Sequence, residues 1–103
     1  MKNFQVIEYT SSEFDGNVTN RWTEKAKNDE IIWNRISKNL RKIYGKNAPY
    51  TLGGDPEALA VDVFYYPDSG EELSYDQYYK KYGVEPTEET ASETISYTIE
   101  EIE

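Results

Sequence analysis

One amphipathic stretch, from Asn28 to Gly45, constrains the fold of this chain more than any other feature of the sequence. Arranged on a helix at about 100° per residue, its large apolar side chains fall within a single stripe. The stripe contains Ile32, Trp33, Ile36, Leu40, Ile43 and Tyr44. Asn28 can cap the first turn, and Gly45 suits the position after the last turn. The pattern predicts a long helix whose stripe has to be covered by another layer.

Three further stretches have the alternation or the β-branched and aromatic content of strands. They are Asn3–Thr10, Leu59–Tyr66 and Thr94–Ile102. The last one alternates isoleucine and tyrosine with serine, threonine and glutamate, which predicts a half-buried strand at or near the edge of a sheet. Thr19–Lys27 fits either a short helix or an irregular approach to the long helix. Tyr66–Gly70 has turn chemistry, and Glu71–Leu73 can pair back as a short hairpin arm.

A second, shorter helix is predicted between Ser74 and Gly83. Ser74 and Gln77 have the spacing of a capping box, in which each side chain binds the backbone N–H of the other residue. Gly83 suits the left-handed residue that ends a helix. Four tyrosines share one face of this helix because they lie three or four positions apart. These are Tyr75, Tyr78, Tyr79 and Tyr82.

Together these elements predict an α+β fold in a single domain, residues 1–103. The simplest arrangement is a small antiparallel or mixed sheet of three to four strands, with the long helix packed on one face and the short helix as a second, minor element. Residues 46–56 have the composition of a loop. Residues 85–93 have the composition of a flexible acidic connection before the C-terminal strand.

The chain contains neither cysteine nor histidine. Disulfides and thiolate metal sites are therefore excluded, and the usual zinc ligand and the usual general base at neutral pH are missing. Asp68, Glu71 and Glu72 lack the spacing of a dedicated calcium loop. We therefore expect no catalytic residues, no metal site and no cofactor, and a chain that is not an enzyme.

Charge is distributed unevenly along the chain. Residues 1–50 carry nine basic and six acidic side chains, whereas residues 51–103 carry two basic and fourteen acidic ones, and the formal net charge is −9. Direct binding of nucleic acid needs concentrated lysine and arginine, so a basic protein surface is the expected partner instead. The basic side of the long helix, with Arg35, Lys38 and Lys42, is expected to be solvated, to pair with the acidic half, or to contact an acidic patch on a partner.

Two features of the second half are candidate partner-binding sites. The tyrosine face of Ser74–Gly83 can cover the edge of the core, or it can form an interface, because tyrosine offers a large contact area at low entropic cost. The acidic side chains can be a solvated coat or a fixed docking surface. This acidic set contains Asp68, Glu71, Glu72, Asp76, Glu85, Glu88 and Glu89.

Asp68–Asp76 and Glu85–Glu89, together with the small size and the lack of cysteine and histidine, resemble the acidic inhibitors of phages and mobile elements. These are the anti-CRISPR and anti-restriction proteins, and the resemblance is one of composition. It implies a stoichiometric inhibitor whose carboxylates imitate nucleic acid and occupy the basic site of a nuclease or another nucleic-acid enzyme. Such inhibitors do not share one fold, so no role is carried over to any residue.

Two other functions fit the same features. An immunity protein or antitoxin would neutralise a basic toxin. A small phage structural or assembly protein would oligomerise through strand edges and the tyrosine face. The sequence has no apolar run long enough for a signal peptide or a membrane span. We therefore expect a cytoplasmic protein, in the host cytoplasm if it is encoded by a phage, with no membrane partner.

Overall fold

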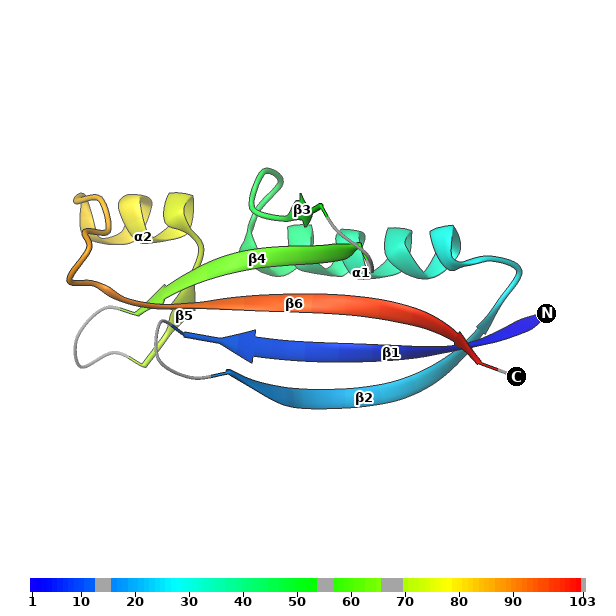
Figure 1. The fold of residues 1–103 in the computed structure, drawn as a ribbon. Coiled ribbons are helices and arrows are strands. Elements are labelled where there is room, and N and C mark those ends of the chain that lie inside the picture. Colours follow the sequence, from blue (N-terminus) through cyan, green and yellow to red (C-terminus); the bar gives the residue numbers. More distant parts are fainter. Residues whose placement is uncertain (13–15, 54–56, 66–69, 103) are drawn as a thin grey trace.

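The computed structural model describes residues 1–12, 16–53, 57–65 and 70–102. Along these residues the elements are β1 (Lys2–Ser11), β2 (Gly16–Ala26), α1 (Asp29–Tyr44), β3 (Tyr50–Leu52), β4 (Ala58–Tyr65), β5 (Glu72–Leu73), α2 (Tyr75–Tyr82) and β6 (Ala91–Ile102). The described strands form one antiparallel sheet in the order β2-β1-β6-β4-β3, with β5 also paired to β4 (Figure 1). The α+β class is confirmed, but the six-stranded sheet is larger than the predicted three to four strands.

The predicted long helix is confirmed as α1, and it packs on one face of the sheet. Its cap is the predicted one, since the Asn28 side chain accepts a hydrogen bond from the backbone N–H of Ile31. Four residues of its stripe are buried: Ile32, Ile36, Leu40 and Tyr44. They pack against apolar side chains of the sheet such as Val6, Val61 and Val63. Each buried side chain of this size stabilises the fold by roughly 1.5–3 kcal/mol.

One residue of the predicted stripe is not part of the core. Ile43 is 50% exposed, although Tyr44 beside it is buried. The two residues lie about 100° apart around the helix axis, and the sheet lies under Tyr44. The stripe that packs on the sheet is therefore narrower than the sequence predicted.

β2 corrects the prediction for Thr19–Lys27, which is neither a short helix nor an irregular segment. It pairs with β1 along its whole length, with Val6 opposite Trp22 and one register shift after Glu8. Its alternation is hard to recognise because β2 is an edge strand, so most of its side chains are exposed and polar. Pairing with β1 decides the conformation of this segment.

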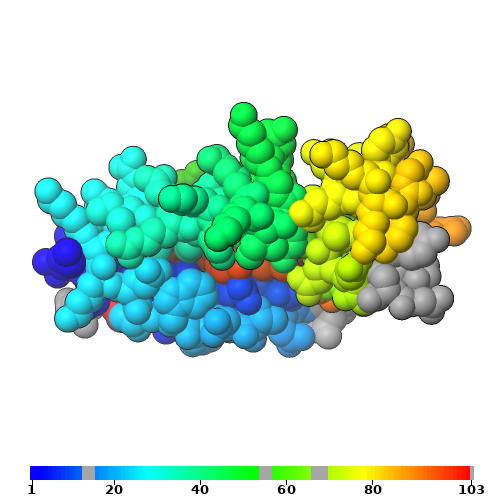
Figure 2. Space-filling model, turned by 180° about the vertical axis from the view of Figure 1, so that it is seen from behind, coloured from blue at the N-terminus to red at the C-terminus, as the bar shows by residue number. Residues whose placement is uncertain are grey.

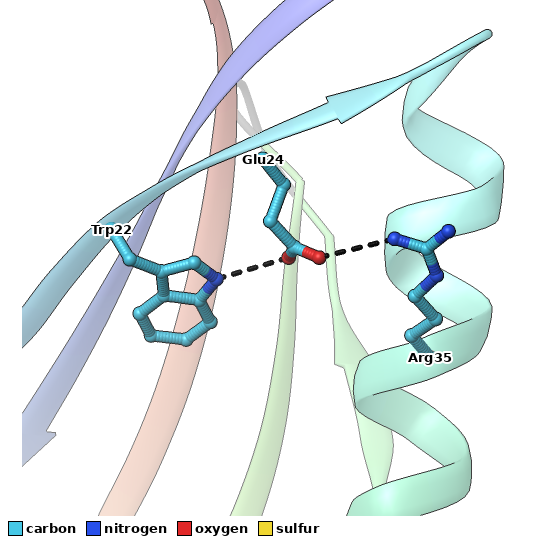
Figure 3. Close-up of polar contacts among 3 residues, drawn as sticks. All are labelled: Trp22, Glu24 and Arg35. Carbon is cyan, nitrogen blue, oxygen red and sulfur yellow. Dashed lines mark hydrogen bonds and ion pairs between the residues drawn. The ribbon is translucent and has the colours of Figure 1, made fainter.

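A polar contact joins this edge strand to α1 (Figure 3). Arg35 donates to Oε1 of Glu24 at 3.2 Å, and the indole N–H of Trp22 donates to Oε2 of the same carboxylate at 3.0 Å. The Trp22 ring also meets the ring of Tyr97 edge to face, with the centroids 6.2 Å apart. Arg35 therefore pairs with an acidic residue of the first half of the chain, and not with the acidic second half.

β6 lies between β1 and β4, so the prediction that it lies at or near a sheet edge is wrong. It also begins at Ala91, inside the stretch 85–93 that was predicted as a connection. Ile95 and Tyr97 point toward the core as predicted, whereas Ser96 between them and Thr98 after them lie on the face opposite α1. A central strand in a sheet with one open face has the same alternation as an edge strand, so the pattern alone could not separate them.

The outer edge of β4 is shared by two short strands. β3 pairs with residues 58–60, and β5 pairs with residues 64–65. β5 confirms the hairpin arm predicted at Glu71–Leu73, whereas β3 shows that residues 46–56 are not entirely loop. Most of the predicted turn Tyr66–Gly70 lies outside the described residues. On this edge, the described strands leave residues 61–63 unpaired.

α2 has the predicted capping residues at both ends. The Ser74 side chain accepts from the backbone N–H of Gln77, and the Gln77 side chain accepts from the backbone N–H of Ser74. Gly83 has φ 71°, the left-handed conformation that glycine adopts without steric cost, and its N–H bonds to the carbonyl of Tyr79. Two further bonds tie α2 to the end of α1: Ser74 donates to the carbonyl of Tyr44, and Gln77 donates to that of Ile43.

The molecule is elongated, with extents of 47 × 28 × 23 Å. The two chain ends lie together at one end of the sheet, where Asn3 is opposite Ile102 (Figure 1). α2 lies at the other end. No helix in the described part of the chain is long and apolar enough to cross a membrane.

Replacing Ser74 by alanine tests the junction between the helices. The variant loses the cap of α2 and leaves a buried carbonyl of α1 without its donor, because Ser74 is only 3% exposed. We expect the free energy of unfolding to fall by about 1–3 kcal/mol, measured by urea denaturation. Ser92→Ala is the matched control, since Ser92 is exposed, and it should change stability by less than about 0.5 kcal/mol. Equal effects of the two substitutions would contradict this account of the junction.

Candidate partner-binding site

α1 is too short to cover the whole face of the sheet on which it packs. Its 16 residues span about 24 Å, whereas the molecule is 47 Å long. Figure 2 shows this face of the molecule, and β6 and β1 are visible between the end of α1 and β2. Toward the end of α1, tyrosines and glutamates join the aliphatic residues on the inner face of the sheet. We call these side chains, together with Tyr44 at the end of α1, the tyrosine–glutamate cluster: Glu8, Tyr44, Tyr65, Glu72, Glu93 and Tyr97.

The first part of the cluster joins the two central strands of the sheet. Glu8 on β1 and Tyr97 on β6 lie directly opposite each other, and the Tyr97 hydroxyl donates to Oε2 of Glu8 at 2.6 Å. Thr19 on β2 donates to Oε1 of the same carboxylate at 2.9 Å. Both oxygens of Glu8 are thus held by side chains from the neighbouring strands, which fixes the position of its charge.

The second part of the cluster joins α1 to the strands at the far end of the sheet. Glu72 on β5 accepts from the hydroxyl of Tyr44 at 3.2 Å and from that of Tyr65 at 3.3 Å. Tyr65 also donates to Glu93 on β6, at 2.9 Å. A buried phenol needs a hydrogen-bond partner, and here each partner is a carboxylate. Three fixed negative charges therefore lie on this face of the sheet.

The surroundings of the cluster keep its phenols protonated. Burial, and then the carboxylate of Glu72, raises the pKa of Tyr44 from 10 to about 12. Burial likewise raises the pKa of Tyr65 and of Tyr97, with further contributions from hydrogen bonds to Glu93 and Glu8. General acid–base catalysis uses groups whose pKa is shifted toward the working pH, and these shifts run the other way. The arrangement is suited to holding charge in place.

The acidic residues singled out from the sequence fall in different surroundings. Asp68 lies outside the described residues. Glu71 forms an ion pair with Lys81, and Glu72 belongs to the cluster. Asp76 lines a pocket near the start of α2. Burial, and then the Glu85 carboxylate, raises the pKa of Tyr75. Glu88 and Glu89 line a cavity of about 340 Å³ together with Tyr65 and Glu93. The structure therefore brings Glu72, Glu88 and Glu89 to the cluster or its border, and does not join the acidic set into one patch.

The tyrosine face of α2 is divided between the core and the surface. Tyr78 is only 4% exposed and packs on Phe64, so it is a core residue. Tyr82 is half-buried and packs on Tyr78, with the ring centroids 5.2 Å apart. Tyr75 and Tyr79 are 44% and 52% exposed. The four rings share a side of the helix, but only these last two present a large surface to solvent.

Sequence reasoning missed five members of the cluster, and for two of them a signal was present. Glu8 follows Phe4 and Val6 at every second position of a strand, so its side chain faces the same side as two buried apolar residues. A charged residue at an inward position is rarely accidental, because burial without a partner is costly. Glu93 stands in the same relation to Ile95.

Most of the negative charge around the cluster is not neutralised by neighbouring cations. In the part of the chain that the structure describes, the ion pairs are Lys2–Glu101, Arg35–Glu24 and Lys81–Glu71. None of them includes a glutamate of the cluster, nor Glu88 or Glu89. Over the same residues, no group of three or more acidic side chains is arranged to hold a metal ion. The cluster and its border are therefore an uncompensated negative surface.

Comparisons of this chain with protein-family models, with curated proteins and with solved structures give no match.

Alkaline titration tests the bonds within the cluster. We expect the three phenols of the cluster to ionise above pH 10, the ordinary pKa of tyrosine, and the ultraviolet absorbance of tyrosinate measures this. Because the folded chain holds these protons more tightly than the unfolded chain, their contribution to stability is complete below pH 10. It is lost as the pH rises toward 12.

Glu8→Gln should move the ionisation of Tyr97 to lower pH, because it removes the negative charge next to the phenol. Glu100→Gln is the matched control, since Glu100 lies opposite Gln5 on the other face of the sheet and should leave the titration unchanged. A single transition near pH 10 for all tyrosines of the unmodified chain would contradict the hydrogen bonds described above.

Proposed function

We propose that this chain is a binding protein that inhibits a nucleic-acid enzyme by occupying its basic nucleic-acid-binding site. It would act stoichiometrically and without a cofactor, in the manner of the acidic anti-defence proteins of phages and mobile elements. The docking surface would be the tyrosine–glutamate cluster together with Glu88 and Glu89 on its border.

The observation that carries this proposal is that the carboxylates of the cluster are both fixed and uncompensated. Phenols and a threonine hold them in place, and the described residues supply no lysine or arginine to pair with them. Acidic side chains that only keep a molecule dissolved need to be neither fixed in position nor free of neighbouring cations. A surface that competes with nucleic acid benefits from both, because fixed negative charges attract a lysine- and arginine-lined channel without losing side-chain entropy on binding. Such attraction speeds association by about 10- to 1000-fold at low salt.

An immunity protein or antitoxin that neutralises a basic toxin would use the same surface in the same way, and the identity of the partner separates these two functions. An assembly protein is a different kind of candidate, and one observation favours it: the outer edge of β2 has no strand partner among the described residues. Arg21, Lys25 and the register shift near Thr19 are, however, features that discourage edge pairing. Sedimentation as a monomer at all concentrations would exclude assembly.

The proposal is tested by two double variants with the same change of charge. Glu88→Lys/Glu89→Lys reverses charge at the border of the cluster, and Glu57→Lys/Glu100→Lys does so elsewhere on the surface. Tagged forms of each are used to capture partners from a lysate of the host cell at low and at high salt. We expect the first variant to bind the captured nucleic-acid enzyme about tenfold or more weakly at low salt, and the second to bind it like the unmodified chain.

The captured enzyme is then assayed for binding of duplex nucleic acid. The unmodified chain should displace the nucleic acid at a one-to-one ratio, and Glu88→Lys/Glu89→Lys should not. If the two double variants weaken capture equally, net charge alone is responsible and the carboxylates are only a coat. Undiminished capture by both would likewise overturn the proposal.

A further inference from the structure

The outer edge of β4 carries a pocket that the proposed docking surface does not use. β3 ends its pairing at Ala60 and β5 begins at Phe64, so the edge between them is open in the described structure. A pocket of about 220 Å³ lies at this opening. Its walls include three aromatic rings and three polar side chains: Tyr50, Phe64, Tyr75, Asn47, Asp62 and Asp76. They come from β3, β4, α2 and the segment that follows α1.

The aromatic walls are set by the sheet and by α2. Phe64 lies two positions after Asp62 on β4, so both side chains face the same side of the sheet, away from α1. Tyr50 on β3 is opposite Ala60 and therefore faces that side as well. Tyr75 in the first turn of α2 meets Phe64 edge to face, with the centroids 6.1 Å apart and the planes at 78°. Ring faces and ring edges thus line the same small cavity.

The carboxylate of Asp62 is held in a defined orientation. Tyr50 and Thr94 both donate to its Oδ1, each at 2.7 Å. Burial, and then the hydrogen bond to Asp62, raises the pKa of Tyr50 to about 12, so the phenol remains a neutral donor at physiological pH. Within the described residues both of these bonds end on Oδ1, which leaves Oδ2 for a donor from outside. Neither Asp62 nor Asp76 takes part in an ion pair of the described chain.

This combination of groups selects a cation. The negative faces of aromatic rings attract cations, and two carboxylates would repel an anion and stay unpaired beside an apolar ligand. The start of α2 contributes a positive end of a helix dipole, but its capping box occupies N–H groups there and Asp76 lies in its first turn. A guanidinium group fits these walls better than an ammonium group, because it is planar, stacks on rings and bonds to carboxylates with several N–H groups.

We propose that the pocket between β3 and β5 binds the guanidinium group of one arginine side chain. Its volume is below the range of pockets for drug-sized ligands, about 300–1000 Å³, so it suits a single side chain. The inference extends the proposed function, since a basic partner presents arginines, and the pocket would then fix the register of that partner against the acidic surface.

The test uses the full chain and a small probe, N-acetyl-arginine amide, titrated by NMR. We expect saturable shifts at Tyr50, Asp62 and Tyr75. N-acetyl-citrulline amide has nearly the same shape without the charge, and N-acetyl-lysine amide, acetylated on its α-nitrogen, keeps the charge without the planar group. Both should bind at least about tenfold more weakly than the arginine probe.

Two variants locate the site on the chain. Asp62→Asn removes the charge but retains an oxygen that accepts from Tyr50 and Thr94, so the fold should persist. Tyr75→Leu retains an apolar contact with Phe64 without the ring face, and it serves as the second variant if Asp62→Asn does not fold. Each should weaken binding of the arginine probe at least about tenfold. Glu57→Gln is the control for charge and should bind like the unmodified chain.

Equal binding of the arginine and citrulline probes, or unchanged binding by both variants, would overturn the pocket proposal. Tighter binding of the lysine probe would overturn the assignment to a guanidinium group. Since this titration needs no partner protein, it separates the two proposals. If Glu88→Lys/Glu89→Lys loses capture but the arginine probe does not bind, the proposed function is supported and the pocket proposal is overturned. If the arginine probe binds but that variant keeps its capture, the pocket proposal is supported and the proposed function is overturned.

Discussion

The structure depends on one constraint: α1, which spans about 24 Å, has to cover a sheet whose longest strand, β6, spans about 40 Å. Under α1 the sheet presents Val6, Val61 and Val63, which form a dry core. Past Tyr44, α1 no longer covers the inner face of the sheet, and aliphatic side chains there would be exposed to water. Tyrosines solve this problem because their rings extend the apolar surface while their hydroxyls reach polar partners. The carboxylates that accept these hydroxyls then create the negative surface.

The carboxylates of the cluster thus accept hydrogen bonds that stabilise the sheet, and they also form its negative surface. Glu8 satisfies the hydroxyls of Tyr97 and Thr19, and this contact joins the neighbouring strands β2, β1 and β6. The same bonds restrict the motion of the charge, so the negative surface is organised in the free molecule. A single set of interactions therefore completes the core and holds in place the negative surface that we propose as the docking site.

Local sequence signals predicted the elements whose stability is local. Both helices have caps and stripes in their own residues, and α1, α2 and β5 were found where the sequence placed them. β2 was missed because its conformation comes from pairing with β1, and β6 was placed wrongly because its neighbours in the sheet are distant in the chain. The cluster was missed for the same reason: Glu8 and Tyr97 are 89 positions apart. Acidic runs can be read along a sequence, whereas contacts across a sheet cannot.

The pairing of Asn3 with Ile102 has a practical consequence. Because the first and last strands run side by side, both chain ends emerge at one extremity, and α2 lies at the other (Figure 1). A fluorophore, an affinity handle or a surface linkage attached to either end would therefore project away from α2 and from the pocket at its start. Attachment to a sensor surface through the N-terminus or through the C-terminus would therefore leave the α2 end of the molecule facing the solution.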